Sequence, residues 1–498
     1  METGKVVYDN EITVYFDRQP DLNGGYFLMF SDGKEILKSN KTHFSYMGLN
    51  EDTEYFIEIK MYDENGSFVR TIFEEEIRTK KTKNKIDISS APYLAKGDGE
   101  TLNTESIQKA LDDCTKDDFV YVPEGTFLTG ALNLHSDTEL VIDGVLQGSE
   151  NPDDYLPKIK SRYEGIERMC FRSLINMGEL DRNTSKTCEN IIIRGKGMIS
   201  GGGTPLGEAM KDTEIENVRK FKEIEGRPVT PENERDIAGV VRGRLINISS
   251  SENVIISGLK LYKGPAWNVH FIYSKNIITY NCSFNSKKVG NGDGWDPDSS
   301  ENCVLFGCDF DTGDDIVAIK SGKNPEGDVI AKPAKNIYVF DCTSEKGGAL
   351  AIGSEMSGGV SNVYVWDCDV SKCAGFHIKA QPQRGGYVRN VHISDCVTPR
   401  LWLLSSVAYN QYGIPSPDTP VFENFYFENI KITNYGIAWK QGYVNCTGLR
   451  IVGFDKKGYE IRNVHLKNIT LAAKPDNSPQ EVEITHAKNI VIENLISE

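Results

Sequence analysis

The sequence has no tract of clustered Lys and Arg: its 56 basic residues are outnumbered by 72 acidic ones, which gives a net charge of −16. Because contacts to nucleic-acid phosphates need clustered basic side chains, nucleic acid is not an expected partner. The chain also has no apolar run near the ~20 residues that a membrane-spanning helix needs, so no membrane partner is expected. An acidic substrate would require cations gathered locally at its binding site.

A signal peptide is missing too, because residues 1–7 contain no apolar core of the required length. As written, the chain is expected in the cytoplasm, and it would be secreted if a leader had been trimmed from it. Cys-x-x-Cys pairs, which are typical of zinc sites, are absent. The 11 Cys are an odd number and several recur at one strand position, so reduced core thiols are expected rather than disulfides or metal ligands.

Residues 1–85 alternate apolar and polar side chains in short runs separated by turn signals such as NGG at 23–25. This pattern predicts a small antiparallel β-sandwich. The segment GLNEDTEY at 48–55 resembles the Leu-to-Tyr corner of a fibronectin type III domain. A polar, charged run at 78–85 is typical of a linker. We therefore expect a first domain over residues 1–85 and a second over residues 86–498.

An internal repeat organises the second domain. Segments that open with Asn and an apolar run recur, with 23 residues between Asn253 and Asn276 and 28 between Asn362 and Asn390. Residues that recur once per coil must stack, so the repeat predicts an all-β, right-handed parallel β-helix with Asn ladders along its turns and Cys and aliphatic ladders inside. Propeller blades need ~40 residues or more and are excluded. The repeated Asn are Asn253, Asn276, Asn302, Asn336, Asn362, Asn390, Asn424, Asn463 and Asn489.

Two segments depart from the strand pattern. A helix is expected from about residue 104, capped by Asn103 or Thr104, with Ile107 and Leu111 at helical spacing, and it would plug the end of the β-helix. Residues 207–237 are charged and helix-prone, and they predict a surface excursion that interrupts the repeat.

Carboxylates are concentrated between residues 291 and 315, in NGDGWDPD at 291–298 and DTGDD at 311–315. Asp293 precedes the Asp314–Asp315 pair by about one coil, so these carboxylates should stack as neighbours on one face. Crowded carboxylates raise one another's pKa, and hydrolysis of a glycosidic bond needs one protonated and one ionised carboxyl group. From the residues alone, a Ca²⁺ site in a binding or lyase-like solenoid stays an alternative.

Four motifs follow one another in the second domain: NGDG at 291–294, GDD at 313–315 with IKSG at 319–322, IGSEMSGG at 352–359, and IK at 378–379 before RGG at 384–386. In this order they resemble the polygalacturonases of glycoside hydrolase family 28. The resemblance implies that Asp314 is the general acid, that Asp293 and Asp315 activate water, that the anomeric carbon is inverted, and that no metal or other cofactor is needed. The substrate-binding residues that it suggests are Asn291, His377, Lys379 and Arg384.

The chain also departs from the family pattern. The segment KGGALA at 346–351 lacks the His that the family places before IGS, Gly292 replaces a Thr, and His377 replaces an Arg. A bidentate guanidinium is thus missing where the family grips a uronate. His377 could serve instead as a pH-sensitive donor, Arg384 could compensate for the lost Arg, and Lys379 would pair with the substrate carboxylate.

The resemblance implies an inverting glycoside hydrolase that cleaves α-linked galacturonic acid residues of pectin-derived chains. A fibronectin-like module before such a solenoid also resembles bacterial exo-acting members. A pectic oligo- or polysaccharide is the expected partner, and the oligomeric state stays open. The alternatives are hydrolysis of rhamnogalacturonan or xylogalacturonan oligosaccharides, a non-catalytic or Ca²⁺-dependent pectin-binding or lyase-like solenoid, and an inactive descendant.

Overall fold

The computed structural model describes residues 3–405, 412–433, 435–438, 442–473 and 482–498. The chain divides into two compact units, Met1–Asn84 and Lys85–Glu498, one residue from the boundary expected from the sequence.

The first unit consists of two antiparallel sheets with the strand orders β1–β2–β5 and β4–β3–β6–β7. Apolar side chains from both sheets, among them Phe16, Phe27 and Ile59, form one buried cluster. At the predicted corner, the hydroxyl of Tyr55 accepts a hydrogen bond from the backbone N–H of Asn50 at 3.0 Å, a contact typical of immunoglobulin-like sandwiches. The strands are β1 (Thr3–Val7), β2 (Glu11–Phe16), β3 (Tyr26–Ser31), β4 (Lys34–Ser39), β5 (His43–Met47), β6 (Glu54–Tyr62) and β7 (Phe68–Arg78).

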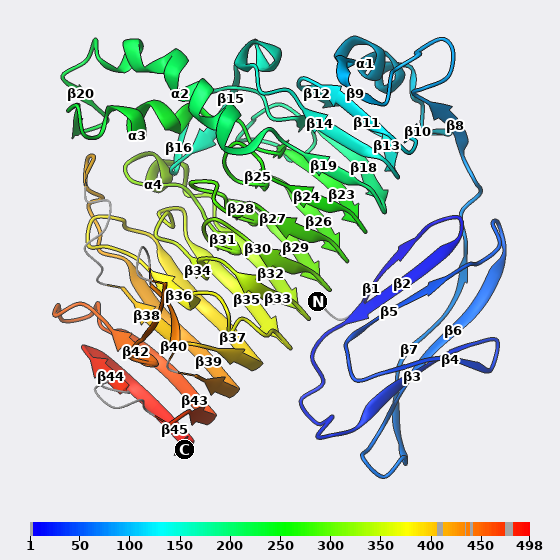
Figure 1. The fold of residues 1–498 in the computed structure, drawn as a ribbon. Coiled ribbons are helices and arrows are strands. Elements are labelled where there is room, and N and C mark those ends of the chain that lie inside the picture. The colour runs from blue at the N-terminus through cyan, green and yellow to red at the C-terminus, as the bar shows by residue number, and fades with distance from the viewer. Residues whose placement is uncertain (1–2, 406–411, 434, 439–441, 474–481) are drawn as a thin grey trace. The chain divides into compact units, whose positions relative to one another are not determined.

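The second unit is a parallel β-helix, as the repeat predicts, and each full coil adds one strand to each of three parallel sheets (Figure 1). The 13-stranded sheet contains β8 (Asn84–Asp87), β10 (Asp118–Val122), β13 (Glu139–Ile142), β18 (Cys188–Gly195), β23 (Ser251–Ser257), β26 (Lys275–Tyr280), β29 (Glu301–Phe306), β32 (Ala334–Phe340), β35 (Val360–Trp366), β37 (Tyr387–Thr398), β39 (Val421–Ile432), β43 (Ile461–Leu471) and β45 (Ala487–Ser497). The eight-stranded sheet contains β9 (Asp98–Leu102), β11 (Thr126–Thr129), β14 (Val145–Gly148), β19 (Met198–Ser200), β24 (Lys260–Tyr262), β27 (Ser283–Asn285), β30 (Asp309–Asp311) and β33 (Thr343–Lys346).

The third sheet has 11 strands and carries the candidate site. Its strands are β12 (Leu132–Leu134), β17 (Ile175–Met177), β22 (Ile246–Ser249), β25 (Val269–Ile272), β28 (Trp295–Asp298), β31 (Val317–Ile319), β34 (Ala349–Ile352), β36 (Gly375–Lys379), β38 (Leu401–Leu404), β42 (Leu449–Val452) and β44 (Val482–Thr485).

Ladders of identical side chains hold successive coils in register. Each Asn of the predicted ladder donates from Nδ2 to Oδ1 of the Asn one coil earlier over 2.9–3.1 Å, and the ladder begins one coil before the prediction, at Asn190. Their φ angles lie between 53° and 62°, in the left-handed region that Asn tolerates better than most residues. All 11 Cys are buried and free, so the expectation of reduced core thiols is confirmed.

Helices and hairpins interrupt the coils at a few places. α1 (Thr104–Asp113) buries Ile107, Ala110 and Leu111 as predicted, but the Asn103 side chain does not cap it and bonds instead to the backbone of Lys96 and Thr101. Within the described residues, no helix combines the length and apolar character that crossing a membrane requires. The other helices are α2 (Gly203–Val218), α3 (Glu234–Ala238), α4 (Glu326–Ile330), η1 (Pro152–Tyr155) and η2 (Gly239–Val241).

The predicted excursion at 207–237 begins four residues earlier, with α2, and ends with α3. Between these helices lies a two-stranded hairpin, β20 (Glu223–Ile224) and β21 (Arg227–Pro228). A second antiparallel hairpin, β15 (Ile159–Tyr163) and β16 (Ile166–Cys170), leaves the coil before β17. The third, β40 (Tyr435–Ala438) and β41 (Gly442–Asn445), lies between β39 and β42 in the chain.

Candidate active site

The predicted catalytic carboxylates come from the turns that precede β28 and β31. Trp295 of β28 is in register with Val317 of β31, which places Asp293 level with Asp315 on neighbouring coils. A backbone hydrogen bond of 2.9 Å from the N–H of Gly294 to the carbonyl of Asp315 ties the two turns together. The structure thus brings Asp293 and Asp315 side by side, as the one-coil spacing predicts.

Lys320 lies at the centre of the charged groups and follows β31 directly. Its Nζ is 3.2 Å from Oδ2 of Asp293, 3.1 Å from Oδ2 of Asp296 and 3.5 Å from the ring centroid of Trp267, and the residue is only 5% exposed. Burial opposes the charge of this ammonium, but Asp293 and Asp296 outweigh that effect and raise the pKa of Lys320 well above its usual range. Lys320 therefore stays charged between two buried carboxyl groups.

The buried carboxyl groups around Lys320 titrate above the ordinary range. Burial raises the pKa of Asp293, with a further contribution from the nearby Asp315 and an opposing one from Lys320. Burial also raises the pKa of Asp296 well above its usual value. Asp314 combines burial with repulsion from Asp293 and Asp315, and its pKa is raised well above its usual value. A carboxyl group that keeps its proton in this way can act as a general acid.

Asp315 is held in a different way, by donors on the later coils. Its Oδ1 accepts a hydrogen bond of 2.6 Å from the backbone N–H of Ala349, and its Oδ2 lies 3.6 Å from Nζ of Lys379. Asp315 is thus held between a backbone N–H donor and an ammonium group. Lys379, predicted to bind a substrate carboxylate, therefore lies at the site and next to a catalytic candidate.

The position of the missing family His is occupied by backbone. A Cβ on Gly348 would lie 2.6 Å from both the backbone N and Oδ1 of Asp315, and a Cβ on Gly347 would lie 2.4 Å from Oγ1 of Thr312. Neither position has space for a side chain. The N–H of Gly348 also donates to the carbonyl of Asp314 at 2.6 Å, so this glycine turn packs directly against the acidic pair.

Asn291, predicted to orient groups at the site, is itself oriented by Arg242. The guanidinium of Arg242 donates to Oδ1 of Asn291 at 2.8 Å and to the carbonyl of Gly290 at 2.9 Å. Arg242 follows η2, directly after the excursion, and it is buried. The segment that leads back from the excursion into the coil thus contacts the turn that carries Asp293.

His377 lies on β36, two residues before Lys379, but it does not supply a charge. Its ring lies edge-on to Trp402, with 5.5 Å between the ring centroids. Burial lowers the pKa of His377 well below its usual value, and Lys379, Arg400 and Arg450 add to the effect. The lowered pKa favours a neutral ring and argues against a donor that changes charge near neutral pH, while substrate binding by His377 stays a prediction.

Arg384 does not reach a substrate surface, so its predicted substrate contact is also revised. The residue is 0% exposed. Its Nε donates to the carbonyl of Ser354 at 2.7 Å, and Nη1 donates to Oδ1 of Asn324 at 2.8 Å. Arg384 therefore holds the IGSEMSGG segment through a buried hydrogen bond and does not line the substrate surface.

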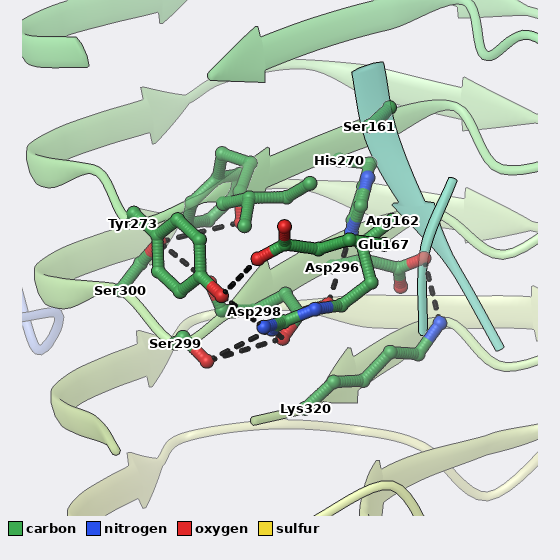
Figure 2. A network of polar contacts seen from close by, with 12 residues as sticks. Ser161, Arg162, Glu167, His270, Tyr273, Asp296, Asp298, Ser299, Ser300 and Lys320 are labelled. Carbon is green, nitrogen blue, oxygen red and sulfur yellow. Dashed lines mark hydrogen bonds and ion pairs between the residues drawn. The ribbon is translucent and has the colours of Figure 1, made fainter. Parts of the chain in front are cut away.

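A buried polar network holds the β15–β16 hairpin over the face of the 11-stranded sheet (Figure 2). Arg162, which is 0% exposed, donates from Nη1 to Oδ1 of Asp298 at 2.6 Å and to Oγ of Ser299 at 3.0 Å. On the same hairpin, Ser161 donates to Oδ1 of Asn247 on β22 at 3.1 Å. The hairpin is therefore anchored to β22 and to β28, the strand that follows Asp293.

The network extends to both sides of Arg162. Tyr273 donates its hydroxyl hydrogen to Glu167 of β16 at 2.7 Å, and His270 lies 3.5 Å from Oδ2 of Asp298. Although burial opposes ionisation, Arg162 and His270 lower the pKa of Asp298 to about 2. Burial lowers the pKa of His270 to about 3. Asp298 is thus an ionised structural anchor, whereas Asp296 faces the catalytic candidates.

A metal site was one alternative for the acidic cluster. Across the residues that the structure describes, no group of three or more His, Cys, Asp or Glu is placed to hold a metal ion. The carboxylates instead face Lys320, Lys379 and backbone N–H groups, which are the partners of an acid–base site.

Lys320, Arg242 and Arg162 contribute to the site, but the sequence reasoning gave them no role. For Lys320 a signal existed, because it follows Asp298 by one coil and forms an isolated parallel bridge with it. Arg162 and Arg242 lie outside the repeat and carried no such signal. Trp267 and His270 are buried wall residues.

Comparison with known proteins agrees with this geometry. The model of the family "Glycosyl hydrolases family 28" matches residues 114–400. The chain is 26% identical over 477 residues to an exo-poly-alpha-D-galacturonosidase of Dickeya chrysanthemi, covering 90% of this chain and 78% of the relative. It is 28% identical over 431 residues to an endo-polygalacturonase of Pectobacterium carotovorum subsp. carotovorum, covering 81% of this chain and 96% of the relative.

Solved structures show the same fold. A family 28 exopolygalacturonase of Yersinia enterocolitica superposes with a TM-score of 0.80 at 21% identity, covering 99% of this chain and 98% of the other. A hyperthermoactive exopolygalacturonase of Thermotoga maritima superposes with a TM-score of 0.67 at 26% identity, covering 83% and 92%. Because the family model spans more than half of the 498 residues and includes Asp293, Asp314 and Asp315, the chain belongs to glycosyl hydrolases family 28.

Proposed function

We propose that this glycosidase is an inverting, exo-acting hydrolase of α-linked galacturonic acid residues in pectin-derived chains. The observation that carries the proposal is the meeting of Asp293, Asp314 and Asp315 on two neighbouring coils, with Lys320 and Lys379 beside them. The similarity over most of the chain to a relative named exo-poly-alpha-D-galacturonosidase supports galacturonan as the substrate.

In this mechanism the carboxyl groups divide the proton transfers. Asp314 holds its proton, because burial and repulsion raise its pKa, and donates it to the glycosidic oxygen as the C–O bond breaks. Asp293 and Asp315 orient a water molecule and accept its proton while its oxygen attacks the anomeric carbon from the opposite face. A direct attack by water inverts that carbon. Lys320 stabilises the ionised form of Asp293.

Exo action is supported by the β15–β16 hairpin. The hairpin lies over the face of the 11-stranded sheet and is anchored to Asn247 of β22 and to Asp298 of β28 (Figure 2). A substrate chain that ran along the sheet past Asp293 toward the earlier coils would meet this hairpin. We therefore expect the chain to end there and to be shortened from one end.

The test is a time course on defined galacturonic acid oligosaccharides with products separated by size. A single short product that accumulates from the first turnovers, together with substrates that are each shortened by that unit, supports exo action. A mixture of internal fragments at early times contradicts it. Anomeric signals in proton NMR during turnover check inversion. Rhamnose-containing disaccharides released from rhamnogalacturonan, with no hydrolysis of galacturonan, would overturn the substrate assignment.

A matched variant tests the role of the hairpin. Replacing residues 158–170 by a short Gly–Ser linker, combined with Asp298→Asn so that no buried carboxylate is left without Arg162, should allow internal fragments to appear. A control that shortens the β20–β21 turn instead should keep the product pattern of the parent protein. Retention of the single-product pattern without the β15–β16 hairpin would contradict its role as the end of the substrate path.

A further inference from the structure

Recognition of a uronate chain needs guanidinium groups that the family motif does not supply in this protein. His377 stands at the motif position and stays neutral, and Arg384 is fully buried behind the site. Lys379 lies 3.6 Å from Asp315 and is a point charge rather than a planar fork. Cations for a second substrate carboxylate must therefore come from another part of the sheet.

Two arginines lie beyond His377 on the next coils of the same sheet. Trp402 of β38 is in register with His377 of β36 on one side and with Arg450 of β42 on the other. The guanidinium carbon of Arg400 lies 3.9 Å from the ring centroid of Trp402, and that of Arg450 lies 5.1 Å from it. The indole N–H donates to the carbonyl of Thr447 at 2.7 Å, which fixes the ring that both arginines contact.

Arg400 lies on the same edge of the sheet as the catalytic carboxylates. Through the successive strand pairings β31–β34–β36–β38, the position of Arg400 is level with Ile316, the residue after Asp315. Three strand steps separate these coils, about 14 Å at the usual strand spacing. A group that contacts Arg400 therefore belongs to a part of the substrate beyond the sugar at Asp314.

The charge around Arg400 is unbalanced. Its Nε donates to the carbonyl of Ala374 at 2.6 Å, and in the described part of the chain no carboxylate forms an ion pair with it. Burial lowers the pKa of Arg400, and the neighbouring Arg450 also contributes to this lowering. Arg450 is partly neutralised, because its Nε lies 2.6 Å from Oε2 of Glu483. In a protein with a net charge of −16, an uncompensated and mostly buried guanidinium is suited to an incoming anion.

We propose that Arg400, supported by Arg450 and held by Trp402, binds a carboxylate of the substrate chain on the side of the later coils. This arrangement moves the guanidinium contact of uronate recognition from position 377 to the following coil. The inference rests on the proposed function, because it names a further substrate-binding residue of the same site. It makes Arg400 a determinant of charge recognition rather than of the chemical step.

The test measures binding with the catalytic step removed. In an Asp314→Asn background, isothermal titration calorimetry compares tetragalacturonate with the same oligosaccharide carrying methyl-esterified carboxyl groups. Arg400→Gln should weaken binding of the free acid about tenfold or more, the loss expected for one charge-assisted hydrogen-bonded pair, and change binding of the ester little. Arg400→Lys keeps the charge and loses the planar guanidinium, so its affinity for the free acid should lie between those of the Arg400 protein and the Arg400→Gln variant. With Asp314 intact, Arg400→Gln should raise KM and leave kcat nearly unchanged.

Arg389→Gln is a matched control. The guanidinium carbon of Arg389 lies 4.1 Å from the ring centroid of Tyr387, so this arginine also covers an aromatic ring, but on the 13-stranded sheet. Arg389→Gln should leave the affinities for the free acid and for the methyl ester unchanged. Glu483→Gln should have the opposite effect to Arg400→Gln. It removes the carboxylate that pairs with Arg450, so the positive charge near Arg400 increases and binding of the free acid should strengthen.

The outcomes separate the two proposals. Equal weakening of acid and ester by Arg400→Gln, or no weakening of either, overturns the role of Arg400 and leaves the proposed function standing. If the protein with Asp314 intact cleaves no galacturonide and the Asp314→Asn protein binds none, the proposed function fails and the role of Arg400 fails with it.

Discussion

Nζ of Lys320 lies 3.2 Å from Oδ2 of Asp293, so a carboxylate proposed to activate water is paired with a buried ammonium. The same ammonium lies 3.1 Å from Oδ2 of Asp296, and it opposes the rise in pKa that burial causes in both carboxyl groups. Lys320 therefore sets how much of Asp293 is ionised at a given pH. It acts through Asp293 as a positioning residue.

Lys320→Met should lower kcat about 100-fold, the scale of one proton-transfer contribution, at pH values where the parent protein is fully active. Without the ammonium, the pKa of Asp293 rises further, and the base is ionised only at higher pH. The acidic limb of the pH–rate profile should therefore move to higher pH. Lys335→Met is the control, because Lys335 pairs with Glu301 at 3.2 Å on a more exposed surface. An unchanged acidic limb in the Lys320 variant would contradict this role.

Asp314→Asn should reduce kcat on galacturonic acid oligosaccharides by roughly 10²–10⁴-fold, because the leaving oxygen no longer receives a proton. An aryl galacturonide with an acidic phenol as leaving group needs less protonation of the leaving oxygen. Asp314→Asn should therefore reduce kcat on this substrate much less. Asp293→Asn removes a base and should lower kcat for the oligosaccharide and for the aryl galacturonide by similar factors. Rates on the two substrates, measured with the same preparations, distinguish these patterns.

Asp311→Asn is the control for this comparison. Asp311 lies in the same coil as Asp314 but pairs with the exposed Lys287 at 3.3 Å. It should keep most of the activity. If Asp314→Asn slowed the aryl substrate as strongly as the oligosaccharide, Asp314 would not be the general acid.

The Arg162–Asp298 pair should make stability depend on acid pH. The pKa of Asp298 is lowered to about 2 in the folded protein, against ~3.9 for a free Asp. This depressed pKa contributes stability that is present above pH 4 and is lost as the pH falls from about 4 toward 2, roughly 2–3 kcal/mol in all.

Asp298→Asn should therefore lower the free energy of unfolding at pH 7 by about 3 kcal/mol, because the buried Arg162 is left without its carboxylate. The difference from the parent protein should shrink as the pH approaches 2, where the parent loses the same charge. Denaturant titrations at pH 7, 4 and 2.5 measure it, with the exposed Asp309→Asn as the control. A pH-independent difference would contradict the ion pair as its cause.

The Asn ladder should carry a measurable part of the stability of the β-helix. Asn362 donates to Asn336, accepts from Asn390 and has a φ of 57°. Asn362→Ala loses two hydrogen bonds and strains the backbone, for a loss of about 2–3 kcal/mol. Asn362→Gly loses the same bonds without the strain and should be less destabilised. Chemical denaturation checks the order, and equal losses in the two variants would assign the effect to the hydrogen bonds alone.

Much of the β-helix could be predicted because its sequence repeats. Asn at the turns and Cys in the core recur once per coil, and each must stack on its own kind, so spacing alone indicated which strands pair. Asp293 and Asp315 were placed together by the same reasoning. Periodicity indicates these contacts because, in a β-helix, each residue stacks on the residue one repeat earlier and one repeat later in the chain.

The parts that lie outside the repeat could not be predicted in the same way. Arg162 comes from a hairpin 136 residues before its partner Asp298, and nothing in the spacing connects them. Arg384 was predicted to bind substrate in place of the missing Arg, but its hydrogen bonds to Ser354 and Asn324 make it a buried support. Burial lowers the pKa of His377, and Lys379, Arg400 and Arg450 lower it further; the two arginines meet His377 only through sheet register.

The coil-by-coil construction of the 11-stranded sheet also bears on how this protein tolerates insertions. An extra coil between β28 and β31 would move Asp293 away from Asp315 by another ~4.8 Å and abolish the shared water site. An extra coil after β42 would leave every carboxylate in place and lengthen the substrate-binding surface by one strand. Lengthening the β-helix at its C-terminal end therefore changes which substrate lengths fit, while its middle coils cannot gain or lose a turn without loss of the chemistry.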